Sequence, residues 1–468
     1  MIALTVGQVA QAVGGVLSIV GPDVLVLDVV TDSSAATAGC MFVAVAGENV
    51  DGHDYAAHAV AAGCVVVLAR RTLAGADGQQ LPCIVVDDPV LALGSLASWY
   101  RDQLVDCQVI AITGSSGKTS TKDLVASILS TLGPTARAQG SFNTEIGLPL
   151  TILSADLETR YLVVEMGMRG PGHIAYLSRI ARPNIGCVVN VGTAHLGMLG
   201  TRQAIADAKG ELIDSLLEGD VAVLNADDPI VSAMARRTLA AVVTFGEAAE
   251  SAVRATDIRL DSRAQPTFTL VDQRAFDVDM ERVALQFSGR HYVSNAAAAA
   301  AIALSAGASL EQVATALRDA RPASRWRMEI GDTGFGVIVV NDAYNANPDS
   351  MRAALRTLAA MSGRSWAVLG EMRELGDESA EQHEAVGRLA IDLGISRVVW
   401  VGEGTLPAHE AALRLSGVEG RSVYVPDVES ALGVLERELE PGDVVLVKAS
   451  RSVGLERVAS GLLGGAST

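Results

Sequence analysis

The sequence predicts an α/β protein of three domains, each with a sheet covered by helices. Its 468 residues exceed what one ordinary hydrophobic core holds, because single cores stop growing at roughly 250 to 300 residues. Hydrophobic residues make up 49% and aromatic residues only 4%, which indicates cores of Ala, Val and Leu, as in buried parallel strands. Short apolar runs alternate with helical patterns along the chain, as is typical of α/β folds.

The first predicted domain, residues 1–106, is a small α/β unit. Gly and Asp turns separate its apolar runs, and the Ala-rich stretch 54–62 has helical spacing. A longer helix is expected at 89–104, next to the domain boundary. The expected strands lie at 24–30, 41–45, 64–69 and 83–86.

The second predicted domain, residues 107–322, is a doubly wound sheet. Its first apolar run, 109–113, leads into a Gly/Ser loop and an amphipathic helix. Further runs, each followed by a turn or a helical pattern, indicate strands with right-handed crossovers. Residues 250–288 look polar and irregular; an Ala-rich helix then begins near Asn295, and Ser309 with Gln312 forms a capping box. The further strands are expected at 161–164, 185–191, 221–224 and 242–245.

The third predicted domain, residues 323–468, follows the linker-like sequence RPASRWR and has a Rossmann-like alternation of strand and helix. Its strands are expected at 337–340, 366–369, 398–401 and 444–447. Its helices are expected near 349–361, 380–393 and 428–439.

Charge and composition exclude several classes of protein. A formal charge of −18 argues against a nucleic-acid or anionic-membrane surface, since both need a broad excess of Lys and Arg. The start of the chain lacks a signal-peptide pattern and no run of about 18 apolar residues occurs, so secretion and membrane insertion are not expected. Five scattered cysteines without a CxxC pair predict reduced, buried thiols in a cytoplasmic protein.

A phosphate-binding loop is predicted directly after the run 109–113. Its glycines let the backbone curl so that several N–H groups face one anion at a helix start. Lys118 would then reach the β- and γ-phosphates of ATP, and the Thr119 hydroxyl would bind Mg²⁺. Ile112 stands where the strict pattern has a glycine, and the alternative is a Gly/Ser turn with a solvated lysine. The loop comprises Gly114, Ser115, Ser116, Gly117, Lys118, Thr119 and Ser120.

Glu165 and His195 each follow an apolar run, which places both near the carboxyl edge of the central sheet, where ligands of open α/β sheets bind. A carboxylate suits Mg²⁺, whereas an imidazole is a less usual ligand that could instead orient water or substrate. From the residues alone, each is explained as well by hydrogen bonding at a strand end.

Eight segments occur in the order expected of one family: TGSSGKTSTKD, GSFNTEIGLPLTIL, VVEMGMRGPGHI, NVGTAHLGMLGT, AKGEL, LNADDP, HYVSNAAAA and NDAYNANPDSM. On these segments the chain resembles the Mur ligases along essentially its whole length. EMGMRGPGHI, NDAYNANPDSM and LGEMRELG are most similar to the member that joins D-alanyl-D-alanine to UDP-N-acetylmuramoyl-tripeptide. The DNPR-type sequence of the ligase that adds diaminopimelate or lysine is absent.

The resemblance implies an ADP-forming ligase of peptidoglycan precursor synthesis. Residues 1–106 would bind the UDP end, 107–322 ATP, and 323–468 the incoming amine. The tripeptide carboxylate would become an acyl phosphate, which the amine then attacks, with Lys118, Lys209 and His195 as catalytic residues. Alternatives are a folylpolyglutamate-type ligase, which lacks a UDP-binding domain, and a P-loop switch or kinase, which has no use for the third domain. We expect a monomer.

The same resemblance implies the ligands of nucleotide and metal. Two magnesium sites would lie among Thr119, Glu165 and His195, next to the phosphate loop. Ser324 replaces a glycine that usually precedes the linker arginine, which leaves Arg327 as the alternative to Arg325. The residues expected to contact the nucleotide beyond the loop are Asn295 at the adenine, and Arg325 and Asp342 from the third domain.

Lys209, in AKGEL, corresponds to a lysine that CO₂ converts to a carbamate in Mur relatives, where it helps to hold the second magnesium. A magnesium site favours anionic oxygen, whereas an ammonium group would repel metal and phosphate. Burial near cations supplies the neutral amine by lowering the lysine pKa. The alternatives are an exposed helix residue and a direct phosphate contact.

Candidate substrate contacts come from two further segments that match the family. Ser141, Asn143 and Thr144 suit the diphosphate or muramyl part, but they could equally cap a helix near Glu145. Ser34 stands where many relatives carry an arginine. The uracil contacts are expected from Ser33, Asn49, Gly52 and His53, which could also be ordinary turn residues.

Overall fold

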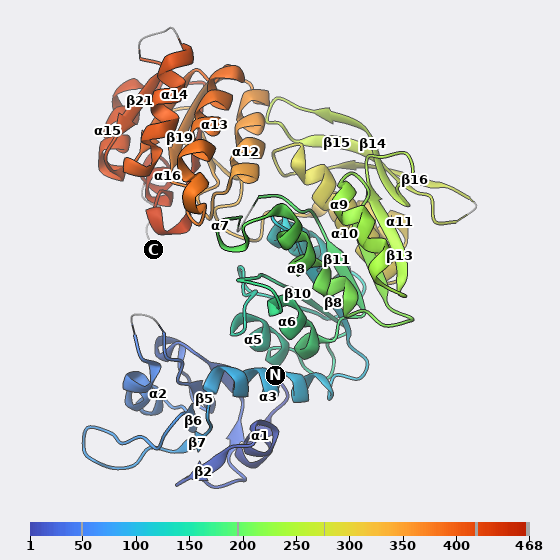
Figure 1. Cartoon of the computed structure of the whole chain (residues 1–468), viewed down its shortest axis with the longest axis vertical. Helices are drawn as coiled ribbons and strands as arrows, with labels where there is room; N and C mark the ends of the chain where they lie inside the picture. Colours follow the sequence, from blue (N-terminus) through green and yellow to red (C-terminus); the bar gives the residue numbers. More distant parts are fainter. Residues whose placement is uncertain (48–49, 194–195, 276, 417–419, 465–468) are drawn as a thin grey trace.

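The structure, a computed structural model, describes residues 1–47, 50–193, 196–275, 277–416 and 420–464. It confirms a three-domain α/β architecture, in which the first domain and the third contact different parts of the central one (Figure 1). No helix within these ranges is long and apolar enough to cross a membrane.

The first domain has a five-stranded sheet in the order β2-β7-β6-β5-β4, parallel from β7 to β4. Helix α3 joins it to the central domain, because its apolar face packs against helices α5 and α6 there. The elements are β1 (Leu4–Thr5), α1 (Val6–Val13), β2 (Val16–Ser18), β3 (Leu25–Val26), β4 (Asp28–Val30), β5 (Cys40–Val43), α2 (Ala56–Ala61), β6 (Val66–Ala69), β7 (Cys83–Val85) and α3 (Pro89–Arg101).

A disulfide joins Cys40 and Cys64, whose Cα atoms are 4.6 Å apart. The expectation of reduced thiols is therefore wrong for this pair. Parallel pairing of β5 with β6 brings the start of one strand beside the turn before the next, a proximity that the spacing of 24 residues does not reveal. Cys83, Cys107 and Cys187 are free and buried, as expected.

The central sheet has nine strands in the order β16-β15-β14-β13-β12-β11-β8-β10-β9. From β14 to β9 the strands are parallel, with helices α4, α10 and α11 on one face and α5, α6 and α8 on the other. The elements up to β13 are β8 (Gln108–Thr113), α4 (Lys118–Leu129), β9 (Thr135–Arg137), α5 (Gly147–Leu153), β10 (Tyr161–Glu165), α6 (His173–Ala181), β11 (Ile185–Val188), α7 (Leu196–Leu199), α8 (Arg202–Asp214), β12 (Val221–Asn225), α9 (Pro229–Ser232) and β13 (Ala241–Gly246).

The region 250–288 is not irregular, contrary to the sequence-based expectation. It forms the strands β14 (Val253–Leu260), β15 (Pro266–Asp272) and β16 (Asp279–Ala284), and β15 pairs antiparallel with both others. In β15 alternate residues are buried, so one face packs on the core while polar residues occupy the other. That half-buried pattern has no apolar run.

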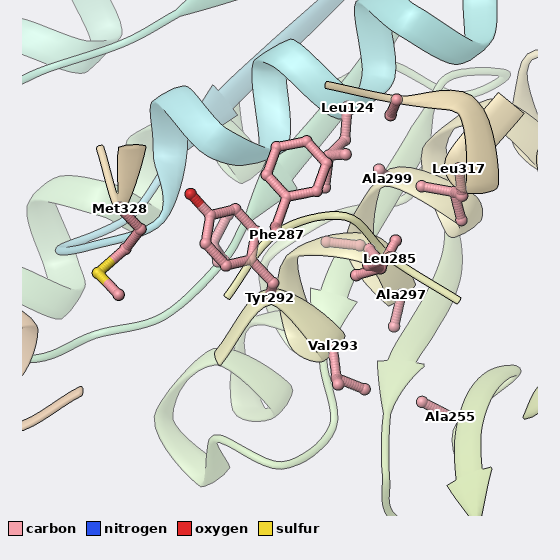
Figure 2. Packing of buried hydrophobic residues seen from close by; sticks show 14 of the residues in the cluster. Leu124, Ala255, Leu285, Phe287, Tyr292, Val293, Ala297, Ala299, Leu317 and Met328 are labelled. Carbon is pink, nitrogen blue, oxygen red and sulfur yellow. The ribbon is translucent and has the colours of Figure 1, made fainter. Parts of the chain in front are cut away.

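Helix α10 (His291–Ser305) is buried along nearly its whole length, and its first turns pack against the phosphate loop. Ala296 to Ala301 are fully buried, and their small side chains let α10 approach α4 closely. Phe287 stacks on Tyr292 with ring centroids 4.8 Å apart, beside Leu124 of α4 (Figure 2). The next helix, α11 (Leu310–Asp319), starts with the expected Ser309–Gln312 capping box.

The third domain has a six-stranded sheet in the order β17-β18-β22-β19-β20-β21, parallel except for β17. Where α7 meets it, Gly197 and Gly376 face each other: a Cβ on Gly197 would lie 2.8 Å from the Gly376 nitrogen. The elements are β17 (Glu329–Asp332), β18 (Ile338–Asn341), α12 (Pro348–Ala360), β19 (Arg364–Gly370), α13 (Ser379–Asp392), β20 (Arg397–Val401), α14 (Leu406–Ser416), β21 (Ser422–Val425), α15 (Val428–Glu438), β22 (Asp443–Lys448) and α16 (Glu456–Leu462).

We predict that Ala299→Leu lowers the thermal unfolding midpoint by several degrees. Extra methylenes in a close-packed core cost about 1 to 3 kcal/mol, and α10 has no exposed side at this position. Ala360→Leu at the exposed end of α12 is the control and should shift the midpoint little. Equal midpoints for the two variants would mean that α10 is not confined.

Candidate functional site

A cavity of about 500 Å³ lies where the carboxyl ends of strands from two sheets converge. The central domain contributes the loop after β8 and the end of β10, and the third domain contributes residues after β18 and the last residue of β22. Ligands of open α/β sheets bind at this edge, so the topology itself selects the site. The lining includes Ser115 to Ser120, Ser141, Asn143, Thr144, Glu165, Arg169, Asn190, His291, Asn295, Arg327, Asp342, Tyr344 and Lys448.

The predicted phosphate loop lies between β8 and α4 and opens into this cavity. Gly117 has φ +79°, a left-handed conformation that favours glycine, and a Cβ there would lie 2.5 Å from Asn295 Oδ1. The Lys118 ammonium donates to the Gly114 carbonyl at 2.9 Å. Of the seven loop residues, only Gly114 is outside the cavity lining.

Asn190, which the sequence reasoning missed, holds the phosphate loop in shape. Its Oδ1 accepts the backbone N–H groups of Ser115 and Ser116, both at 3.0 Å, and its Nδ2 donates to the Ser116 carbonyl at 3.1 Å. Asn190 follows β11 at the same sheet edge. A polar residue near the end of the apolar run 185–191 was the available signal.

Glu165 ends β10 and is almost fully buried, so its charge needs partners. Thr119 Oγ1 donates to its Oε2 at 2.7 Å, and Asn143 Nδ2 donates to its Oε1 at 2.8 Å. Helix α5 begins at Gly147 without a side-chain cap, so Asn143 and its neighbours do not serve the capping role left open by the sequence.

Two lysines at the site, the half-buried Lys118 and the buried Lys209, have lowered pKa values. Burial chiefly lowers the pKa of Lys118, with the charge of Arg327 acting in the same direction and Glu165 opposing it. Burial, and then the charge of Lys118, hold the pKa of Lys209 well below its ordinary value. Lys209 is 1% exposed and its Nζ lies 3.9 Å from Met168 Sδ, which rules out the exposed-helix alternative.

The third domain presents a paired carboxylate and a stacked arginine to the cavity. Asp342 accepts from Lys448 Nζ at 2.6 Å and from the Met328 N–H at 3.1 Å. Arg327 lies over the Tyr344 ring, 4.2 Å from its centroid. Arg325, by contrast, is exposed and outside the lining, so the linker brings its other arginine to the site.

Two of the buried polar atoms that lack a hydrogen-bond partner among the described residues belong to cavity-lining residues of α10. They are Asn295 Nδ2, a donor, and His291 Nδ1; burial lowers the pKa of His291 to about 4, which makes its ring neutral near pH 7. Buried polar atoms are normally satisfied, so this pair fits a heterocyclic ligand with donor and acceptor groups, such as adenine.

The residues fit magnesium as a companion of phosphate. Within the described ranges, no group of three or more His, Cys, Asp or Glu side chains could hold a metal by itself. Mg²⁺ is commonly held by one or two protein oxygens together with phosphate oxygens and water, and the Thr119–Glu165 pair supplies such oxygens beside the loop. Of the two further predicted ligands, His195 lies outside the described residues and Lys209 is a buried residue of α8.

The predicted uracil contacts lie in the first domain and not at this cavity. Both ring nitrogens of His53 are engaged, Nδ1 with Asp51 Oδ1 at 2.6 Å and Nε2 as acceptor of the Arg70 N–H at 3.1 Å. Ser33 is half-buried in a short 3₁₀ turn, and Gly52 passes so close to Val45 that a Cβ would lie 2.7 Å from its carbonyl oxygen. Asn49 is outside the described residues.

Three family descriptions match successive parts of the chain. "Mur ligase family, catalytic domain" matches residues 28–100, "Mur ligase middle domain" 112–303, and "Mur ligase, glutamate ligase domain" 326–451. A Mycobacterium tuberculosis protein named UDP-N-acetylmuramoyl-tripeptide–D-alanyl-D-alanine ligase is 45% identical, over 99% of this chain and 98% of its own. Its Escherichia coli K12 namesake is 36% identical over 99% of each chain.

Solved structures with the same arrangement cover nearly the whole chain. MurF from Acinetobacter baumannii has a TM-score of 0.87 at 33% identity, covering 98% of this chain and 99% of its own. A second structure from that organism, described as UDP-N-acetylmuramoylalanyl-D-glutamyl-2,6-diaminopimelate–D-alanyl-D-alanyl ligase, has a TM-score of 0.85 at 32% identity, covering 98% of both. MurF ligase from Thermotoga maritima in complex with ADP has a TM-score of 0.79 at 29% identity, covering 94% and 97%.

We predict that Asn190→Ala weakens binding of Mg·ATP about tenfold without unfolding the protein. The variant loses the side-chain hydrogen bonds that pre-shape the loop, each of which contributes about 0.5 to 1.5 kcal/mol. Titration calorimetry with the non-hydrolysable analogue measures the change. An unchanged affinity would show that the loop keeps its shape without Asn190.

Proposed function

The chain belongs to the Mur ligase family, and we propose that it joins D-alanyl-D-alanine to UDP-N-acetylmuramoyl-tripeptide in an ATP-dependent, ADP-forming reaction. The observation that carries the proposal is one cavity shared by two domains. A phosphate loop and a buried Thr119–Glu165 pair line it from the central domain, and Arg327 and Asp342 line it from the third. The 45% identity to a full-length ligase of that name supports the substrate assignment.

The reaction requires two displacements. The terminal carboxylate of the tripeptide attacks the γ-phosphorus of ATP, the bond to ADP breaks, and an acyl phosphate forms. The amine of D-alanyl-D-alanine then attacks the acyl carbon, loses a proton, and expels phosphate from a tetrahedral intermediate. Lys118, which lies in the phosphate loop, supplies positive charge to the transferred phosphoryl group. This matters because catalysis of phosphoryl transfer is chiefly electrostatic.

Thr119 and Glu165 would hold magnesium, which neutralises phosphate charge when bound. A second magnesium is part of the proposal and would involve His195 and a carbamate on Lys209. The buried Lys209 amine, with its lowered pKa, supports this step, because only a neutral amine adds CO₂. Conversion replaces a neutral amine beside Lys118 with a negatively charged carbamate.

The substrate residues are assigned by domain. Ser141, Asn143 and Thr144 line the cavity and would contact the muramyl or diphosphate part, while Asn295 would meet the adenine. Arg327 takes the nucleotide role first expected of Arg325. Residues 1–106 would bind the UDP end through Ser33 and Gly52, with His53 stabilising the turn; 107–322 would bind ATP, and 323–468 the dipeptide amine. The protein would act as a cytoplasmic monomer.

The test is phosphate release from ATP measured with each substrate present or omitted. Release that needs both UDP-N-acetylmuramoyl-tripeptide and D-alanyl-D-alanine, with the peptide product confirmed by mass spectrometry, supports the ligase. Release with neither substrate, or with a folate in place of the muramoyl peptide, would refute it.

We predict that Lys118→Ala lowers kcat at least about a hundredfold, because the transition state loses a fixed positive charge. Binding of UDP-N-acetylmuramoyl-tripeptide and the thermal midpoint should change little. Near-normal kcat would remove the phosphate loop from the mechanism.

We also predict that Lys209→Ala is nearly inactive and that a small carboxylic acid partly restores turnover by occupying the vacated carbamate position. A carbamate resonance in ¹³C NMR after addition of labelled bicarbonate, present in the wild type and lost in the variant, gives a readout independent of activity. Full activity without additive would dismiss the lysine. Inactivity that no acid relieves, without a carbamate signal in the wild type, would favour a direct phosphate contact.

A further inference from the structure

The segment that leaves β10 runs beside the loop before α5, and three polar contacts join them. Asn143 Nδ2 donates to Glu165 Oε1 at 2.8 Å, and the Gly167 N–H donates to the Asn143 carbonyl at 2.8 Å. Farther along, Arg169 Nη1 donates to Glu145 Oε1 at 2.9 Å. These contacts connect Glu165, next to the phosphate loop, with Arg169, and both residues line the cavity.

Arg169 is held in place but its guanidinium stays accessible. Its backbone N–H donates to His173 Nδ1 at 3.0 Å, which puts the imidazole proton on Nε2, 3.0 Å from Glu145 Oε2. That last pair is within ion-pair distance but lacks hydrogen-bond alignment. The Arg169 side chain is 70% exposed, against 14% for His173 and 24% for Glu145.

Each of the other three Lys and Arg side chains of the cavity lining has a contact within the protein, although Arg327 Nε has no hydrogen-bond partner among the described residues. Lys118 donates to a phosphate-loop carbonyl, Arg327 stacks on an aromatic ring, and Lys448 is paired with Asp342. Arg169 uses one guanidinium nitrogen on its carboxylate neighbour, and its remaining side-chain donors have no acceptor within the described part of the chain. In a protein of charge −18, such a cation beside the reaction site is suited to an anionic substrate group.

We propose that Arg169 is a specificity residue that binds a carboxylate of the peptide substrate other than the one that reacts. The inference rests on the proposed function. A tripeptide containing alanyl, D-glutamyl and diaminopimelyl residues, as in the description of one similar ligase, has two such carboxylates. A guanidinium can bind either in a two-point contact that a lysine cannot reproduce.

The spacing along the chain agrees with this role. Arg169 lies four positions after Glu165, which is at the phosphate-loop end of the cavity, and four extended residues span at most about 14 Å. Two residues of an extended peptide span at most about 7 Å, and the length of an arginine side chain covers the difference. A carboxylate on the reacting residue itself or on the residue before it is therefore within reach.

The experiment is steady-state kinetics of the full chain with three UDP-muramoyl peptides. The first, called the natural acid, is the diaminopimelate tripeptide with its non-reacting carboxylates free. In the second the D-glutamyl carboxylate is converted to an amide, and in the third lysine replaces diaminopimelate. For the wild type, the analogue that lacks the recognised carboxylate should show a KM about tenfold higher, with kcat within about twofold, since a charge-assisted hydrogen bond is lost. The identity of that analogue tells which carboxylate is bound.

Arg169→Gln should raise KM for the natural acid about tenfold and abolish the preference over that analogue. Arg169→Lys should keep part of the preference, because the charge remains while the two-point contact is lost. Arg179→Gln is the matched control, an exposed arginine on α6 outside the cavity lining, and should behave as the wild type. Thermal midpoints verify that all three variants fold.

The possible results distinguish a failure of the Arg169 proposal from a failure of the proposed ligase function. If Arg169→Gln keeps the wild-type KM, or raises KM equally for all three peptides, Arg169 does not read a carboxylate and the inference is overturned. An unaltered KM of the wild type for both analogues overturns it as well. If the wild type turns over ATP without needing any muramoyl peptide, the proposed function fails and the inference falls with it.

Discussion

The hydrogen bonds that the buried Glu165 carboxylate accepts from Thr119 and Asn143 organise the site. A buried charge without partners would be too costly to keep, so these contacts are required by the fold as well as available to a ligand. They fix the first turn of α4 and the loop before α5 against the end of β10. The phosphate loop, the Thr119 hydroxyl and the segment that leads to Arg169 all take their positions from this carboxylate.

Close packing behind the loop supplies the second constraint. Helix α10 can approach α4 because its buried face consists of alanines, and the approach brings Asn295 against Gly117. Glycine is then needed on one side and small residues on the other. The Ala-rich composition that first indicated an α/β fold is therefore also the reason that the polar side chain of Asn295, near the start of α10, reaches the phosphate loop.

The sequence predicted most of what depends on local pattern. The parallel strands β8, β10 and β12 lie where apolar runs were expected, because strands buried on both faces must be continuously apolar. Strand β13 also lies where it was expected, although its first residues are exposed. The meander β14 to β16 escaped prediction since its strands are buried on one face only. Within the site, the positions of the phosphate loop and of Glu165 were predicted because each directly follows or ends an apolar strand. Their roles as ligands remain predictions.

What could not be predicted depends on proximity between distant segments. Asn190 braces a loop 75 residues earlier, and Cys40 meets Cys64 only after two strands have paired. The choice between Arg325 and Arg327 depends on which way the linker turns, and Trp326 between them has a positive φ of 59° that no local pattern indicates. Burial of Lys209 is likewise a result of tertiary packing.

The contact between Gly197 and Gly376 has a consequence for how sequences of this kind can diverge. Each glycine faces the backbone of the other's segment, and a Cβ on Gly197 would overlap main-chain atoms, which cannot be trimmed by mutation. A substitution at either position therefore cannot be rescued by a smaller residue opposite, because the partner already has no side chain. Only a shift of the whole backbone segment could accommodate a side chain at either position. We therefore expect substitutions at these two positions to accumulate more slowly than their exposure alone suggests.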